Sequence, residues 1–269
     1  MPEQFMVFQG GLPLYVFSAV LGLVTGSFAN VCIYRLPREK SVVTPPSSCP
    51  SCGKQIKPWD NIPLLSYLFL RGRCRACGQP ISPRYPLVEA LNGLLYFLVA
   101  YRYGLTPATL FYFVFATALV IITFIDLDFQ IIPDEITLPG ILLGILGAWL
   151  ILPDPFRLLG GMGLKTSLIG AATGFGLYYI IAVASRGGMG GGDIKMMAMV
   201  GAVLGWKGVL LTTFAGSLLG SAVGLYLMIA KGKGRKTKIP FGPFLALGAL
   251  ISLFFGREVV FWYLRHGQF

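Results

Sequence analysis

The chain has 269 residues, of which 55% are hydrophobic and only 12% charged, and its formal net charge is +11. A soluble domain has about twice that share of charged residues, so the composition excludes an ordinary soluble globular protein. Because the basic residues gather at the ends of apolar segments, the charge favours contact with an anionic lipid bilayer. We expect no nucleic-acid partner.

Apolar segments recur along the whole chain, and a bilayer span needs ~20 such residues. We expect about eight transmembrane helices, the sixth of which is short enough to be a half-span. They cover residues 12–34, 85–101, 108–125, 136–152, 164–184, 194–204, 208–230 and 240–255.

Lys and Arg are concentrated in the loops on one side of these spans, the side that also holds residues 35–84. Basic loops face the cytoplasm. We therefore expect residues 35–84 on the cytoplasmic side and both termini outside.

The polar segment 35–84 contains a repeat, because residues 49–53 (Cys-Pro-Ser-Cys-Gly) return as residues 74–78 (Cys-Arg-Ala-Cys-Gly). Two such knuckles predict a closed, tetrahedral and structural zinc site, and the glycine of each allows a turn with positive φ. Two disulfides or free thiols are the alternative, although disulfides rarely persist in the cytoplasm. The expected zinc ligands are Cys49, Cys52, Cys74 and Cys77. The predicted fold class is an all-α polytopic membrane protein with a small cytoplasmic zinc-ribbon-like insertion between the first and second transmembrane helices.

Acidic residues follow the third span. Carboxylates at a span boundary are costly unless they are solvated or paired, so they are candidates for function. Asp126 directly follows an apolar run and is hard to explain as a surface group, whereas Asp128 fits a solvated, interfacial side chain. Asp134 follows Pro133 at the start of the next span and fits a helix N-cap.

A single carboxylate, Asp193, ends the glycine-rich run 187–192. The run lacks the Gly-Lys-Ser/Thr ending of a phosphate loop. A flexible linker and a helix cap at Asp193 are the plain alternatives. Glycines also let two backbones approach closely, which would bring Asp193 near Asp126. Two adjacent carboxylates share one proton, so one acts as a base and the other as an acid, and the pair can activate water.

These residues together resemble the type IV prepilin peptidases, which are bifunctional leader peptidases and N-methyltransferases of bacterial pilus and type II secretion systems. The glycine run with Asp193 resembles the Gly-x-Gly-Asp motif of intramembrane aspartyl proteases. The other segments that carry the resemblance are residues 26–31, 35–37, 59–63, 82–86 with Glu89, 125–128 and 239–244.

The resemblance implies that Asp126 and Asp193 are the catalytic acids. It implies active-site support from Gly190, Gly192, Asp128, Pro240 and Pro243. The implied reaction removes the short basic leader of a prepilin or pseudopilin after a glycine, at the cytoplasmic boundary of the bacterial inner membrane. The new N-terminal residue is then methylated from S-adenosylmethionine. The expected domains are a first transmembrane helix (1–34), the four-cysteine domain linked to methylation (35–84) and the peptidase domain (85–269).

The residues that bind S-adenosylmethionine stay unassigned, because the sequence has no strand–glycine–helix unit for it. Two other functional classes remain open. An ion-coupled transporter also uses intramembrane carboxylates and glycine-broken spans, although the spans show no repeat. A zinc-bearing membrane scaffold would need neither aspartate.

Overall fold

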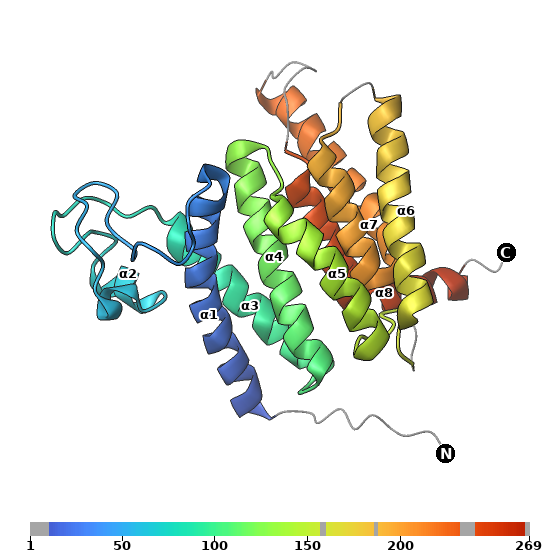
Figure 1. The fold of residues 1–269 in the computed structure, drawn as a ribbon, viewed down its shortest axis with the longest axis horizontal. Coiled ribbons are helices and arrows are strands. Elements are labelled where there is room, and N and C mark those ends of the chain that lie inside the picture. Colours follow the sequence, from blue (N-terminus) through green and yellow to red (C-terminus); the bar gives the residue numbers. More distant parts are fainter. Residues whose placement is uncertain (1–10, 157–159, 186–187, 232–239, 267–269) are drawn as a thin grey trace. The chain divides into compact units, whose positions relative to one another are not determined.

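The structure is a computed structural model that describes residues 11–156, 160–185, 188–231 and 240–266. These residues form helices joined by loops, with isolated bridges and no β-strand among them, which confirms the predicted all-α fold class (Figure 1). The first ten residues of the predicted first domain lie outside the described part. The chain divides into two compact units, residues 1–121 and 122–269, and each is described by itself.

Every predicted span coincides with a helix or with part of one. The long helices are α1 (Leu12–Arg35), α3 (Arg84–Tyr103), α4 (Pro107–Phe129), α5 (Asp134–Leu150), α6 (Gly163–Ala184), α7 (Gly191–Lys231) and α8 (Gly242–His266). Among the described helices, α1, α4, α6, α7 and α8 are long and apolar enough to cross a membrane. Helix α7 includes both the sixth and the seventh predicted span.

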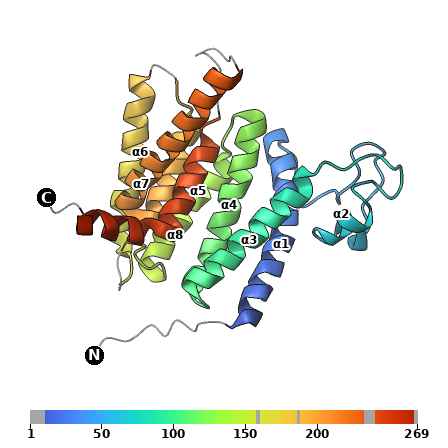
Figure 2. The same cartoon turned by 180° about the vertical axis from the view of Figure 1, so that it is seen from behind.

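In the first unit, α1 and α3 pack in opposite directions (Figure 2). Asn30 near the end of α1 donates to the backbone oxygen of Tyr85 at the start of α3 (3.0 Å), and Asn92 donates to that of Gly22 (2.8 Å). A Cβ at Gly22 would lie 2.8 Å from the α3 backbone, so the glycine permits this close approach. The loop between the two helices contains η1 (Leu36–Arg38), η2 (Pro58–Asn61) and α2 (Leu65–Phe69).

In the second unit, α7 packs against α5, α6 and α8, and it is interrupted at Gly205 (φ 71°, ψ 178°). Before the break, Gly201 lies against Gly170 of α6; after it, Gly220 lies close to Phe241, just before α8. These contacts show that α7 reverses direction at Gly205. The part before Gly205 covers about 21 Å at 1.5 Å per residue, which agrees with the predicted half-span.

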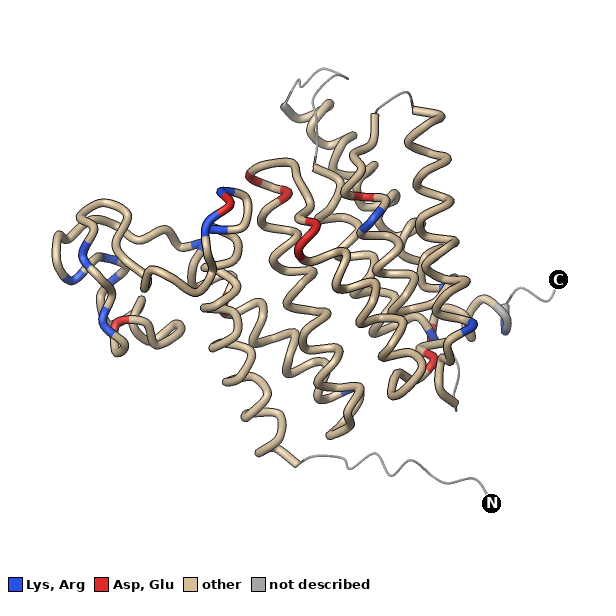
Figure 3. Tube along the Cα trace, in the orientation of Figure 1, with Lys and Arg blue, Asp and Glu red and all other residues tan. Residues whose placement is uncertain are grey.

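The reversal determines which helix ends meet. The end of α4 and the starts of α5, α7 and α8 all lie at one end of the second unit. Charged residues lie mainly in the loop of the first unit and near helix ends (Figure 3), as expected for helices whose middle parts face lipid.

Candidate active site and metal centre

Asp126 lies in the last turn of α4, which continues to Phe129, and only 6% of the residue is exposed. The backbone N–H of Gly242 donates to its Oδ2 at 2.8 Å. Gly242 is the first residue of α8, and the first N–H groups of a helix have no partner within the helix and form its positive end. The start of α8 therefore stabilises a buried carboxylate 116 residues away in the sequence.

Gly242 contacts a candidate catalytic acid, and the sequence interpretation did not single it out. A Cβ at this position would lie 2.8 Å from Oδ2 of Asp126 and 3.1 Å from its Cγ, so only glycine lets the two groups approach this closely. The expected support residues were its neighbours Pro240 and Pro243. Pro243 is buried in the first turn of α8, where proline costs no helical hydrogen bond.

Asp193 is the third residue of α7 and is half-buried. Its Oδ2 accepts the backbone N–H of Gly190 at 3.3 Å, and its own N–H donates to the oxygen of Gly190 at 3.2 Å. The carboxylate is close enough to Asp126 to feel its charge. The structure thus brings together the two acids that the sequence put forward, from the end of α4 and the start of α7.

The glycines before Asp193 differ in their surroundings. A Cβ at Gly192 would lie 2.8 Å from the Cβ of Ile132, whereas one at Gly190 would lie at an ordinary 3.5 Å from the Asp193 carboxylate. Gly192 therefore allows the start of α7 to pack on the segment that follows α4. Asp128 is exposed.

Two further residues, Asp134 and Tyr178, make contacts that the sequence interpretation did not indicate. Asp134 was expected to cap α5, but the N-cap is Pro133 and the Asp134 side chain makes no cap bond. Asp134 instead forms an ion pair with Lys195 at 2.6 Å. The prediction of an N-cap at Asp134 is therefore wrong. Tyr178 is buried in α6, near enough to Asp193 to feel its charge, and donates to Thr213 at 3.3 Å. A tyrosine within an apolar helix was the only signal for it.

The four cysteines of the first unit form one cluster, in which the sulfurs all lie within 4.8 Å of one another. The Sγ atoms of Cys49 and Cys77 are 3.9 Å apart, close to the edge of about 3.8 Å that a tetrahedron with Zn–S bonds of about 2.3 Å has. None of the cysteines in the described part of the chain forms a disulfide. The donor set and its spacing therefore fit a tetrahedral thiolate metal.

The two knuckles have the same backbone geometry. In each, the glycine has φ 71° and its N–H donates to the oxygen of the first cysteine at 2.9 Å. The N–H groups of Cys52 and Ser51 lower the pKa of Cys49 to about 6. The Gln79 N–H lowers the pKa of Cys77, but desolvation and the other three sulfurs together raise it to about 11.

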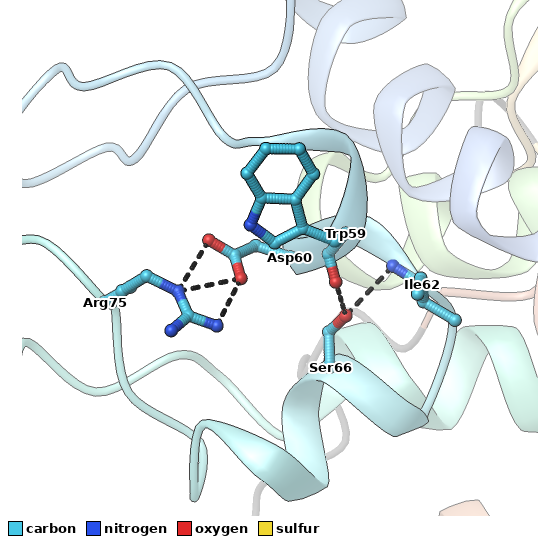
Figure 4. A network of polar contacts seen from close by, with 5 residues as sticks. All are labelled: Trp59, Asp60, Ile62, Ser66 and Arg75. Atoms are coloured by element: carbon cyan, nitrogen blue, oxygen red, sulfur yellow. Dashed lines mark hydrogen bonds and ion pairs between the residues drawn. The ribbon is translucent and has the colours of Figure 1, made fainter.

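A polar network joins the second knuckle to the η2 turn (Figure 4). Arg75 binds Asp60 through Nε (2.9 Å) and Nη2 (2.7 Å), and the guanidinium holds the pKa of the Asp60 carboxyl below its usual value. Ser66 donates to the backbone oxygen of Trp59 at 2.8 Å and accepts the N–H of Ile62 at 3.0 Å. The turn that carries residues 59–62 is thereby fixed from two sides.

Comparison with known proteins assigns this chain to a family. The model of the bacterial peptidase A24 N-terminal domain matches residues 20–103, and that of the type IV leader peptidase family matches residues 113–225. The chain is similar to the prepilin leader peptidase/N-methyltransferase of Pseudomonas putida, with 39% identity over 90% of this chain and 91% of that protein.

Proteins of the same name from Aeromonas hydrophila (39% identity, 95% and 96% of the two chains) and Neisseria gonorrhoeae (36%, 93% and 94%) are similar over equally long stretches. No solved structure matches the chain. The chain belongs to the type IV leader peptidase family, which confirms the resemblance that its motifs indicated.

Proposed function

We propose that the protein removes the short basic leader of type IV prepilins or type II secretion pseudopilins after a glycine, and then methylates the new N-terminal residue. Asp126 and Asp193 are the catalytic acids of the cleavage. The observation that supports this most is their meeting at one end of the second unit, where the first N–H of α8 holds Asp126.

The proposed cleavage uses the two carboxylates in different protonation states. Because two close carboxylates cannot both ionise easily, one is a base and the other an acid. The base takes a proton from water as the oxygen attacks the scissile carbonyl, and the acid gives its proton to the leaving amine. The N–H groups of Gly242 and Gly190 keep each carboxylate oriented through the exchange.

The sidedness follows from the basic residues. The loop of the first unit contains Arg and Lys at many positions and only a few acids, and such loops stay in the cytoplasm. We infer an inner-membrane protein whose cysteine loop and aspartates lie on the cytoplasmic side, where a short basic leader precedes an apolar pilin segment.

Cys49, Cys52, Cys74 and Cys77 hold the metal, which we infer to be a structural zinc because four thiolates leave no open position for catalysis. S-adenosylmethionine supplies the methyl group of the second reaction. The name of the relatives supports this second activity.

The test uses purified full-length protein and a prepilin substrate. Asp126→Asn and Asp193→Asn should each abolish cleavage and leave thermal unfolding close to wild type. The matched control is Glu135→Gln, an exposed acid in the first turn of α5, which should cleave normally. If either aspartate variant cleaves at the wild-type rate, the assignment is wrong. Loss of activity in Asp128→Asn, with Asp126→Asn active, would move the second acid to Asp128.

A further inference from the structure

A cavity of about 310 Å³ in the first unit is built from segments that the proposed cleavage does not use. Its walls come from the end of α1, from the loop 42–47 and from the stretch around η2. Ligand sites commonly have volumes of about 300–1,000 Å³. Three of the sequence segments that carried the family resemblance contribute residues to it: 26–31 and 35–37, which are neighbours in the chain, and the more distant 59–63.

The lining of the cavity combines one cation, several hydrogen-bonding groups and apolar surface. Arg35 lies at one side, where Nη1 donates to the oxygen of Ser41 (2.8 Å) and Nη2 to that of Pro45 (2.6 Å). A guanidinium has five N–H groups, so donors are left for a carboxylate. Side chains of Ser27, Ser47 and Asn61 add polar groups. The apolar part comes from Val24, Phe28, Val31, Val42, Val43 and three prolines.

A buried carboxylate lies directly behind this wall. Glu89 of α3 is 8% exposed and hydrogen-bonds to Ser27, which lines the cavity. Its Oε2 also accepts the N–H of Leu64 at 2.9 Å. Leu64 has a φ of 58°, a conformation that non-glycine residues rarely adopt and that is found preferentially at functional sites. The residue before it, Pro63, is part of the cavity wall.

We propose that this cavity binds S-adenosylmethionine, the methyl donor, an assignment that rests on the proposed methyltransferase function. Arg35 binds the carboxylate of the methionine part, because a guanidinium pairs with a carboxylate through two parallel hydrogen bonds. The prolines and valines of the loop 42–47 cover the flat adenine, and Asn61 and Ser47 bind its polar edge or the ribose. The carboxyl oxygens of Glu89 behind Ser27 favour the positive sulfonium over a neutral thioether.

The placement of Asn61 connects the cavity with the metal module. Asn61 follows Asp60, which Arg75 holds from between the cysteines of the second knuckle. A metal held by the four cysteines would fix the second knuckle, and Arg75 and η2 connect this knuckle with the cavity wall. It would thereby support methylation without contact to the donor.

The experiment measures binding of methyl-labelled S-adenosylmethionine to the purified full-length protein by equilibrium dialysis, beside cleavage of a prepilin. Arg35→Gln should weaken binding about 10- to 100-fold, which is the affinity that the loss of a charge-assisted hydrogen bond removes. Arg38→Gln is the matched control at the same helix end, because Arg38 donates to the oxygen of Tyr34 and stacks on its ring. It should stay within about twofold of wild type, as surface substitutions do.

A second pair of variants guards against a folding defect in Arg35→Gln. Val31→Phe adds volume from the α1 wall of the cavity and should weaken binding at least about tenfold, since overpacking costs about 1–3 kcal/mol. Val20→Phe, on an exposed part of the same helix, should bind normally. All four variants should still cleave the prepilin.

Two outcomes overturn the proposal. One contradicts only the cavity assignment, and the other also contradicts the proposed methyltransferase function. If the wild type binds S-adenosylmethionine and both Arg35→Gln and Val31→Phe bind it equally well, the cavity is not the site, while the methyltransferase function stands. If the wild type cleaves but neither binds nor uses S-adenosylmethionine, the methyltransferase half of the proposed function fails together with the cavity.

Discussion

Gly242→Ala tests whether the start of α8 positions Asp126, one of the two proposed catalytic acids. The added Cβ would lie 2.8 Å from Oδ2 and 3.1 Å from Cγ of the aspartate, which is closer than such contacts normally come. The carboxylate must therefore move by some tenths of an ångström, and the 2.8 Å hydrogen bond from the Gly242 N–H lengthens or breaks. A hydrogen bond to a charged group is worth about 1.5–3 kcal/mol.

We expect kcat for prepilin cleavage to fall about 10- to 100-fold, which corresponds to about 1.4–2.7 kcal/mol of lost transition-state stabilisation. The assay is single-turnover cleavage at saturating substrate, with thermal unfolding measured on the same preparations. Alanine has the higher helix propensity and the carboxylate can yield, so the unfolding transition should change little.

Gly176→Ala is the matched control, because this glycine lies within α6 and a Cβ there would meet nothing within 4 Å. It should cleave at the wild-type rate. The reasoning is refuted if Gly242→Ala cleaves as fast as wild type while Asp126→Asn is inactive, since Asp126 would then act without the contact from α8.

Three further results are expected. Gly192→Ala should slow cleavage because its Cβ would lie 2.8 Å from that of Ile132, whereas Gly191→Ala has open space around it and should not; equal rates for the two would contradict the packing argument. Metal analysis of the pure protein should find about one zinc per chain, and serine at all four cysteines should remove it and lower methylation, but not cleavage. Lys195→Met should lower the unfolding free energy by at most about 1 kcal/mol, because its ion pair with Asp134 is exposed; chemical denaturation measures this, and a larger loss would show a structural role.

The helices could be predicted from the sequence because each has an apolar run of its own. The predicted spans match the observed helices, and the cysteine repeat correctly indicated two identical knuckles, since both signals are local. Asp126 stood out for the same reason, as an acid directly behind apolar residues. The helix continues past Asp126 to Phe129. The predicted span ended earlier, because the acidic residues at this end interrupt the apolar run.

The partners of these residues could not be predicted, because they come from distant parts of the chain. Gly242 holds Asp126 across 116 residues, and nothing in the local sequence says which atom its N–H faces. The capping role expected for Asp134 failed because Lys195, 61 residues away, offers a charge partner. The reversal of α7 depends on the backbone of one glycine, Gly205, among many that look alike.

The residues proposed for cleavage and those proposed for methylation lie in different units, so the two activities should be separable by mutation. Asp126 and Asp193, the proposed catalytic acids, belong with Gly242 to the second unit, whereas the cysteine cluster, Arg75–Asp60 and the cavity belong to the first. The two family models divide the chain in the same sense. A substitution in the interior of either unit should therefore impair one reaction and spare the other. Cleavage must precede methylation, because only cleavage exposes the new amine. Loss of the methylation proposed for the first unit should therefore yield a mature but unmethylated pilin, whereas loss of the cleavage proposed for the second unit should stop both reactions.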